Sequence, residues 1–240
     1  MHTLNAQGLS KSYDGRFVIK DIDISVRSGE IVGLLGPNGA GKTTTFYMIV
    51  GMLRPERGSI LLDGEDIGRL PMYKRARKGL SYLPQEPSIF RRLTVRENLR
   101  AVLEIKGFAD AEIEEKIRGL IEEFRLGEFA DRESIRLSGG ERRRAEIARS
   151  IAAEPKFILF DEPFAGIDPI AIIELKKMLR YLKEQGLGIL ITDHNVRETL
   201  SITDRAYILA HGEILDEGPP EKLAASERAK DIYLGEEFKL

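Results

Sequence analysis

The sequence contains no cysteine. That absence excludes a disulfide-stapled scaffold, a cysteine-liganded metal site and a cysteine nucleophile. The sequence also lacks any apolar run near the roughly 20 residues that cross a bilayer, and its first residues do not form the apolar segment of a signal peptide. The apolar runs at 157–160 and 187–191 have the length of strands. We therefore expect a cytosolic protein.

An excess of charge of one sign is also missing. Lys and Arg number 37, and Asp and Glu number 39, which leaves a formal net charge of −2 over 240 residues. A nearly neutral chain has no overall attraction to nucleic acid or to anionic lipid. With 42% hydrophobic and 32% charged residues, the composition is that of a globular protein long enough to bury a full core.

Hydrophobic patterning predicts an α/β protein. Apolar and polar residues alternate over 22–26, which is typical of a half-buried antiparallel strand, and Asp14-Gly15 is a plausible turn shortly before it. Apolar runs without alternation lie at 31–35, 157–160 and 188–192. Such runs indicate strands buried on both faces, and parallel strands of this kind need helices between them.

Two segments carry a helical period. The first apolar stripe consists of Ile113, Ile117, Leu120, Ile121 and Phe124, and the second of Ile172, Leu175, Leu179 and Leu182. Asp110 is the expected N-cap of the first helix, while Pro169 and Gly186 bracket the second. Residues 86–155 are mostly helical in pattern and fall between core strands, which predicts an inserted helical subdomain. Residues 204–216 predict a closing hairpin.

A glycine-rich segment at 36–43, GPNGAGKT, fits the pattern G-x-x-x-x-G-K-[ST] between a predicted strand and a helical run. Glycines let successive backbone N–H groups turn toward one anion, and the following helix adds the positive end of its dipole. Lys42 supplies a charge for the β- and γ-phosphates, and the Thr43 hydroxyl can ligate Mg²⁺. The residues expected to contact the nucleotide are Gly36, Asn38, Gly39, Ala40, Gly41, Lys42, Thr43 and Thr44. A glycine-rich turn with a chance lysine is the alternative, and the loop alone does not separate kinases, GTPases and transport ATPases.

Residues 157–162, FILFDE, form an apolar strand that ends in two carboxylates. Ligands of α/β folds bind beyond the carboxyl ends of the strands, which is where Asp161 and Glu162 fall. Asp161 can hold Mg²⁺ through water, and Glu162 can act as the general base that polarises the attacking water. Solvated acids at a strand end are the alternative. Because a small-molecule kinase has no use for a base aimed at water, Glu162 favours hydrolysis.

Residues 137–141, LSGGE, open a helix. Ser138 and Glu141 predict a capping box, which is a common way to start any helix. Gly139 and Gly140 need a further reason, because each glycine weakens a helix by about 1 kcal/mol. Glycines at a helix N-terminus suit close approach to a phosphate.

Together these segments resemble the motif set of the ATPases of ABC transporters. The set comprises 36–43, Gln85, 137–141, 157–162, 166–168 and 192–194, in the family's order over nearly the whole chain. The resemblance implies an α/β P-loop NTPase core with a mostly parallel sheet flanked by helices, an N-terminal antiparallel β subdomain and an inserted helical subdomain. In this single domain of 1–240, the nucleotide-binding core spans 1–85 and 156–216, the helical subdomain spans 86–155, and 217–240 form a C-terminal tail.

The resemblance also implies a head-to-tail homodimer that sandwiches two ATP molecules. Each ATP lies between the phosphate loop of one chain and Ser138, Gly139 and Gly140 of the other. Two positions depart from the common family pattern: Glu141 occurs where Gln is usual, and 165–168 are AGID where SALD is more usual. Asp168 is retained and is expected at the nucleotide.

Three further residues take their roles from the resemblance. Tyr13 is expected to stack on adenine, His194 to contact the γ-phosphate, and Gln85 to sense Mg²⁺ and couple to a membrane partner. Thr43, Gln85 and Asp161 are the expected metal residues, and Glu162, His194 and Gln85 the expected catalytic ones. The alternatives are a half-buried strand aromatic at Tyr13 and a surface histidine at His194.

Strings between the general motifs resemble one subfamily, the ATPases of lipopolysaccharide transport systems. They are LPMYKRAR at 70–77, YLPQEPSIF at 82–90, SGGERRR at 138–144, EPFAGIDPI at 162–170, TDHNVRETLS at 192–201 and YLGEEFKL at 233–240. This resemblance implies a peripheral homodimer on the cytoplasmic face of the inner membrane, docked through 85–92 on two integral membrane permease subunits. It would drive lipopolysaccharide out of the membrane without touching the lipid itself, and it would bind no nucleic acid. Phe90, beside two arginines, is the candidate docking anchor, and packing of Phe90 into the helical subdomain is the alternative.

Other functions remain open at this point. The ATPases of branched-chain amino-acid importers are similar in size. Soluble ABC proteins of DNA repair or translation usually carry coiled-coil insertions or a second ATPase domain, and this chain has neither. Glu162 and His194 argue against a binding module that does not hydrolyse nucleotide. ATP and Mg²⁺ are the expected cofactors.

Overall fold

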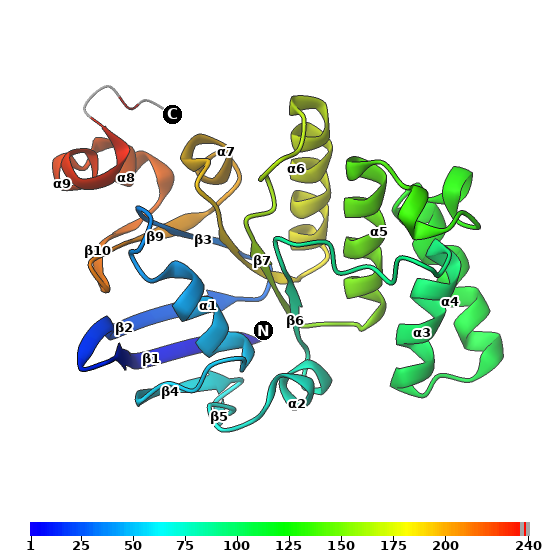
Figure 1. The fold of residues 1–240 in the computed structure, drawn as a ribbon, viewed down its shortest axis with the longest axis horizontal. Coiled ribbons are helices and arrows are strands. Elements are labelled where there is room, and N and C mark those ends of the chain that lie inside the picture. The colour runs from blue at the N-terminus through cyan, green and yellow to red at the C-terminus, as the bar shows by residue number, and fades with distance from the viewer. Residues whose placement is uncertain (236–237, 239–240) are drawn as a thin grey trace.

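Two β-sheets organise the chain (Figure 1). The computed structural model describes residues 1–235 and residue 238. The antiparallel sheet has the order β2-β1-β4-β5 and consists of β1 (Thr3–Tyr13), β2 (Arg16–Arg27), β4 (Arg57–Leu62) and β5 (Glu65–Asp66). The second sheet has the order β10-β9-β3-β8-β7-β6 and consists of β3 (Ile31–Leu35), β6 (Leu80–Leu83), β7 (Phe157–Asp161), β8 (Gly188–Thr192), β9 (Arg205–Ala210) and β10 (Glu213–Gly218).

The second sheet carries the functional loops. Strands β9, β3, β8, β7 and β6 run parallel, and β10 pairs antiparallel with β9. Strands β3, β7 and β8 are buried along their whole length, as their unbroken apolar runs predict. Because the strands are parallel, the segments that follow β3, β7 and β8 emerge at the same edge of the sheet.

Nine α-helices are present among the described residues. They are α1 (Lys42–Val50), α2 (Met72–Arg77), α3 (Val95–Lys106), α4 (Asp110–Glu123), α5 (Gly139–Ala152), α6 (Pro169–Glu184), α7 (Val196–Leu200), α8 (Pro220–Ala225) and α9 (Glu227–Ala229). Helices α3, α4 and α5 stand together at the end of the molecule away from the antiparallel sheet (Figure 1). Among all the described residues, no helix has both the length and the hydrophobicity needed to span a bilayer.

The two predicted hairpins form at left-handed turns. Asp14 (φ 50°) and Gly15 (φ 77°) join β1 to β2, and His211 (φ 51°) and Gly212 (φ 80°) join β9 to β10. Positive φ at both central residues matches the twist of a tight hairpin. The predicted fold class, a mostly parallel α/β core with an antiparallel N-terminal sheet and a helical insert, is confirmed.

One predicted helix start is wrong. Ala109, not Asp110, occupies the N-cap of α4, and its backbone N–H donates to the Glu112 carboxylate at 3.0 Å. Asp110 is instead the first helical residue, where its negative charge still faces the positive end of the helix dipole. The predicted apolar stripe is correct, since Ile113, Ile117 and Leu120 are buried.

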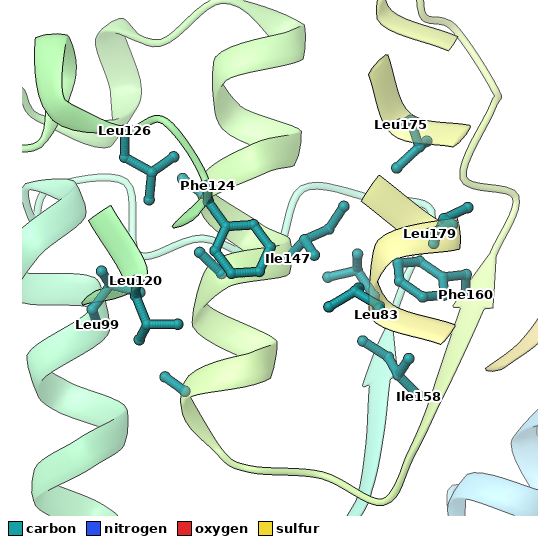
Figure 2. Packing of buried hydrophobic residues seen from close by; sticks show 14 of the residues in the cluster. Leu83, Leu99, Leu120, Phe124, Leu126, Ile147, Ile158, Phe160, Leu175 and Leu179 are labelled. Atoms are coloured by element: carbon teal, nitrogen blue, oxygen red, sulfur yellow. The ribbon is translucent and has the colours of Figure 1, made fainter. Parts of the chain in front are cut away.

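The helical insert shares its core with the sheet. Figure 2 shows Leu99, Leu120, Phe124 and Ile147 in one continuous cluster with Ile158 of β7 and Leu179 of α6. Helix α5 lies in the middle of this cluster, between the other inserted helices and the sheet. A movement of α5 is therefore transmitted to both sides by direct packing.

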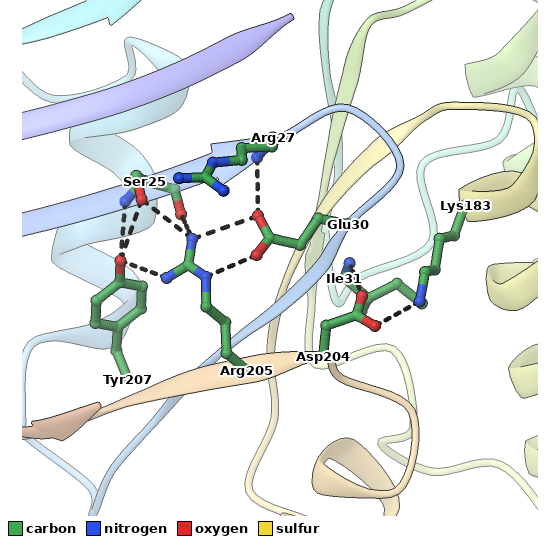
Figure 3. A network of polar contacts seen from close by, with 8 residues as sticks. All are labelled: Ser25, Arg27, Glu30, Ile31, Lys183, Asp204, Arg205 and Tyr207. Carbon is green, nitrogen blue, oxygen red and sulfur yellow. Dashed lines mark hydrogen bonds and ion pairs between the residues drawn. The ribbon is translucent and has the colours of Figure 1, made fainter. Parts of the chain in front are cut away.

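A polar network ties the two sheets together near the start of β3. In Figure 3 the Arg205 guanidinium on β9 donates to the Glu30 carboxylate at 2.7 Å and to the backbone oxygen of Ser25 on β2 at 2.5 Å. It also donates to the Tyr207 hydroxyl at 2.6 Å. Charge-assisted bonds of this kind fix the angle at which β2 meets the parallel sheet.

The C-terminal segment folds back on the sheet. Helices α8 and α9 and a π turn at Lys230–Leu234 place Leu223, Ala229 and Tyr233 against Leu35 of β3 and Leu200 of α7. Within the string at 233–240 that resembles lipopolysaccharide transport ATPases, residues 236, 237, 239 and 240 lie outside the described residues.

Candidate active site

The phosphate loop connects β3 to α1, as the sequence predicts. Gly36 has a φ of 152°, and a Cβ atom there would lie 2.0 Å from the Leu209 backbone oxygen. Gly41 has a φ of 109°, and a Cβ atom there would lie 2.3 Å from Cδ1 of Ile19. Both positions therefore require glycine on steric grounds as well as for backbone conformation. Asn38 and Gly39 lie at the exposed tip of the loop.

The Lys42 side chain points into this loop and holds its backbone by hydrogen bonds. Its ammonium group donates to the backbone oxygens of Gly36 at 2.7 Å and Pro37 at 3.0 Å, and the residue is 8% exposed. Burial lowers the pKa of Lys42, and the carboxylates of Glu162, Asp161 and Asp193 oppose that shift. The ammonium group is thus a buried cation facing acidic groups, placed to exchange its carbonyl partners for phosphate oxygens.

Asp161 ends β7 in a buried position. Its Oδ2 accepts a hydrogen bond from the Tyr82 hydroxyl on β6 at 3.0 Å, and the residue is 7% exposed. Burial raises the pKa of Asp161, and the Tyr82 hydrogen bond opposes the rise. This role of Tyr82 could not be predicted, because a single tyrosine on a strand carries no signal of a polar partner on the next strand.

Glu162 and His194 face each other at the ends of β7 and β8. Nδ1 of His194 lies 3.3 Å from Oε2 of Glu162. Glu162 has a φ of 46°, a left-handed conformation that is uncommon outside glycine, and its backbone N–H donates to the Thr192 oxygen at 2.7 Å. This backbone turn directs the carboxylate away from the strand axis and toward the histidine. The structure thereby brings together two of the three predicted catalytic residues.

Asp193 stabilises the loops that carry Glu162 and His194. Its carboxylate is fully buried and accepts hydrogen bonds from the backbone N–H groups of Phe164 at 2.9 Å and Asn195 at 2.8 Å. Burial raises the pKa of Asp193, and these two hydrogen bonds oppose the rise. One side chain therefore fixes both the loop after Glu162 and the loop that carries His194. The motif at 192–194 contains Asp193, but this role could not be predicted, because both hydrogen-bond partners are set by the tertiary fold.

A cleft of about 480 Å³ opens beside these residues. Its walls include Thr43, Gln85, Asp161 and Glu162. Hydroxyl, amide and carboxylate oxygens are the ligands that Mg²⁺ prefers, and Oδ1 of Asp161 makes no hydrogen bond within the described residues. The residues present therefore fit a magnesium ion. The rest of the wall consists of Tyr47, Met52, Met72, Tyr82, Pro84, Glu86, Ser88 and Arg149.

Three predicted nucleotide residues, Ser138, Gly139 and Gly140, do not line this cleft. The Ser138 hydroxyl caps α5 by accepting from the Glu141 N–H at 3.3 Å, and the Glu141 carboxylate accepts from the Ser138 N–H at 2.8 Å. The predicted capping box is thus confirmed. A Cβ atom on Gly139 would meet nothing within 4 Å, and one on Gly140 would meet Ala171 at 3.8 Å. Packing within this chain therefore does not require glycine at either position.

Tyr13 and Asp168 also lie outside the cleft. Tyr13 ends β1 with 48% of its surface exposed, and the Lys11 ammonium lies 5.4 Å from its ring centroid. Asp168 caps α6, with its carboxylate accepting from the N–H groups of Ile170 and Ala171, each at 3.0 Å. Both side chains are accessible, and their roles at the nucleotide stay predictions.

Helix α5 holds the segment after Gln85. The buried Glu146 carboxylate accepts from the backbone N–H groups of Ser88 at 2.8 Å and Ile89 at 3.3 Å. The Arg149 guanidinium donates to the Ser88 hydroxyl at 2.9 Å and lies 5.0 Å from the Phe90 ring centroid. Phe90 keeps 49% of its surface exposed on this support, so it is available to a partner.

The fold and this site define a P-loop nucleotide-hydrolysing protein, with a phosphate loop and a paired acid and histidine at adjacent strand ends. Comparisons with known proteins narrow the class. Residues 19–165 match the family model described as ABC transporter. The chain belongs to the ATP-binding proteins of the ABC transporter family and is an ATPase of that family. The resemblance inferred from the motifs is confirmed.

Full-length relatives give a finer comparison. The lipopolysaccharide export system ATP-binding protein LptB of Haemophilus influenzae is 58% identical over 241 residues, covering 100% of both chains. LptB of Escherichia coli strain K12 is 55% identical with the same coverage. Among solved structures, the ADP conformation of MJ1267, an ATP-binding cassette of an ABC transporter, superposes with a TM-score of 0.87 at 27% identity, covering 98% of this chain and 100% of that one. CbiO1 from Clostridium perfringens gives 0.86 at 27% identity, covering 95% and 92%.

Proposed function

We propose that the chain is the ATP-hydrolysing motor subunit of a lipopolysaccharide export system. The observation that carries the chemistry is the Glu162–His194 pair beside the phosphate loop, within one edge of the sheet. The observation that carries the substrate is similarity along the whole length to lipopolysaccharide export ATP-binding proteins.

The proposed hydrolysis depends on four sets of groups: those that hold the phosphates, those that hold Mg²⁺, the base Glu162, and His194. The backbone N–H groups of 38–43, the Lys42 ammonium and the Thr44 backbone hold the phosphates of ATP. Thr43, Gln85 and Asp161 would hold Mg²⁺, and the ion would supply positive charge for the phosphate oxygens. Glu162 accepts the proton of the attacking water, and His194, 3.3 Å away, contacts the γ-phosphate.

Two chains complete each site. Ser138, Gly139 and Gly140 present backbone at the start of α5, and no side chain among the described residues packs over Gly139. A helix N-terminus of that kind suits the γ-phosphate of an ATP bound to a second copy. The head-to-tail homodimer therefore encloses two ATP molecules, with Tyr13 stacked on adenine and Asp168 near the interface. Hydrolysis at Glu162 releases the dimer.

Two integral membrane subunits supply the transport path. They dock on residues 85–92, where Phe90 is 49% exposed, and Met52 and Met72 are also exposed near Gln85. An exposed aromatic with arginines beside it is a typical interface anchor. The ATPase then lies peripherally on the cytoplasmic face of the inner membrane, and it contacts neither the lipid substrate nor nucleic acid.

Copurification tests the assignment. The chain expressed in its own cells with an affinity tag is expected to bring down two multi-spanning membrane proteins in detergent, and lipopolysaccharide is expected to change the ATPase rate of that complex. The Phe90→Ala variant should lose the membrane proteins, whereas Ile105→Ala, at a 77% exposed apolar position on α3, should retain them. Recovery of ribosomes or DNA overturns the assignment. Membrane subunits that respond to branched-chain amino acids redirect it to import.

A further inference from the structure

Tyr82 is a half-buried tyrosine on the wall of the cleft, and its hydroxyl contacts the Asp161 carboxylate. It lies on β6, which pairs in parallel register with β7, and Tyr82 aligns with Leu159 there. Its hydroxyl donates to Oδ2 of Asp161 at 3.0 Å. Among residues 1–235 and 238, no other hydrogen-bond donor reaches the Asp161 carboxylate. One side chain on the neighbouring strand therefore determines how Oδ2 of Asp161 is held.

A phenylalanine would fill the same space on the strand. It would keep the ring in place but would leave Oδ2 of Asp161 without the Tyr82 donor. The Tyr82 hydroxyl is thus a donor directed at a single oxygen of Asp161.

Within the described residues, Oδ1 of Asp161 makes no hydrogen bond, and Asp161 shares the cleft wall with Thr43 and Gln85. We propose that Tyr82 is a positioning residue that holds Oδ2 of Asp161 and thereby presents Oδ1 to magnesium. This inference rests on the magnesium site proposed above.

The test compares ATP affinity with and without metal. In the Glu162→Gln background, which removes hydrolysis, ATP binding is measured once with Mg²⁺ and once with EDTA. Tyr82→Phe is expected to reduce the gain in affinity due to Mg²⁺ by about tenfold, because a hydrogen bond to a charged group is lost. Affinity in EDTA should be unchanged. Tyr73→Phe is the matched control, since Tyr73 is 59% exposed on α2.

Thermal unfolding without nucleotide checks that Tyr82→Phe remains folded. An unchanged Mg²⁺ gain, or an equal loss of affinity in both buffers, overturns the positioning role of Tyr82. If the Glu162→Gln protein binds ATP equally well with Mg²⁺ and with EDTA, the proposed magnesium site is wrong. In the hydrolysing protein, Tyr82→Phe should raise the Mg²⁺ concentration needed for half-maximal turnover and leave the rate at saturating Mg²⁺ near that of the parent.

Discussion

Nδ1 of His194 lies 3.3 Å from Oε2 of Glu162, although 32 residues separate them in the chain. The two are brought together because β7 and β8 are neighbouring parallel strands, with Asp161 aligned to Thr192. Asp193 then fixes both following loops through two backbone hydrogen bonds. The acid and the histidine form a unit whose spacing depends on the sheet and not on either loop alone.

Replacing Glu162 by glutamine should abolish turnover. The amide keeps the size of the side chain but cannot accept the proton of water, and a general base contributes about 10²–10⁴-fold to rate. Phosphate release measures the loss, and size-exclusion chromatography with ATP and Mg²⁺ should show trapped dimers. The Glu213→Gln variant, changed at an exposed residue of β10, serves as the control. Hydrolysis at the parent rate would mean that Glu162 is not the base.

Replacing His194 by alanine should lower turnover at least tenfold with little change in stability. The His194 side chain is 62% exposed, so its removal leaves no cavity, whereas its contact with Glu162 puts it beside the proposed base. Steady-state ATPase assays and thermal unfolding separate the two effects. His211→Ala, in the β9–β10 turn, should leave the rate unchanged. Equal rates for both variants would remove His194 from the mechanism.

Replacing Arg75 by leucine should destabilise the fold by about 3 kcal/mol, because buried carbonyl oxygens lose their donor. Arg75 is 1% exposed, and burial lowers its pKa to about 10, so it stays charged at neutral pH. Its guanidinium donates to the backbone oxygens of Met48, Ile49, Gly68 and Leu70. Urea denaturation measures the effect, with the exposed Arg77→Leu as control. A change within 0.5 kcal/mol, the size expected for an exposed surface site, would contradict this reasoning.

The free energy of unfolding should fall at low pH because of Asp63. Partial burial raises its pKa, but hydrogen bonds from Lys156, Thr3 and His2 outweigh burial and lower the pKa to about 2. The ionised carboxylate therefore stabilises the fold above about pH 4, and this contribution is lost as the pH falls toward 2. Asp63→Asn should cost about 1 kcal/mol at pH 7, because the site is partly exposed, and progressively less as the pH falls from 4 through 2.

Urea denaturation at pH 7, 4 and 2.5 measures this difference. Lys156→Met should reduce the same pH dependence, since the Lys156 ammonium lies 2.6 Å from Oδ2 of Asp63. A gap between the parent and Asp63→Asn that stays constant from pH 7 to 2.5 would contradict the low pKa.

Much of the fold could be predicted from local sequence patterns. The uninterrupted apolar runs of β3, β7 and β8, the turn at Asp14-Gly15 and the capping box at Ser138 are all encoded within a few residues. The phosphate loop is equally local, because backbone conformation at Gly36 and Gly41 needs no distant partner to be recognised. These features could be predicted since neighbouring residues determine them.

Contacts between distant segments could not be predicted in the same way. The bond between Tyr82 and Asp161 depends on β6 lying beside β7, and the bond between Glu146 and Ser88 spans 58 residues. At the start of α4, Asp110 and Ala109 are adjacent, and only the backbone geometry shows which one is the cap. Side chains that act by holding other side chains were missed because their partners are set by the tertiary fold.

Helix α5 begins with Gly139 and Gly140 and, two turns later, holds the segment after Gln85 through hydrogen bonds of Glu146 and Arg149 to Ser88. A helix of 14 residues is a stiff rod, so its two ends cannot be displaced independently. In the proposed dimer, α5 therefore couples one chain's contact with its neighbour's ATP to its own contact with a membrane subunit. Variants that remove the hydrogen bonds to Ser88 should hydrolyse ATP without transporting the substrate.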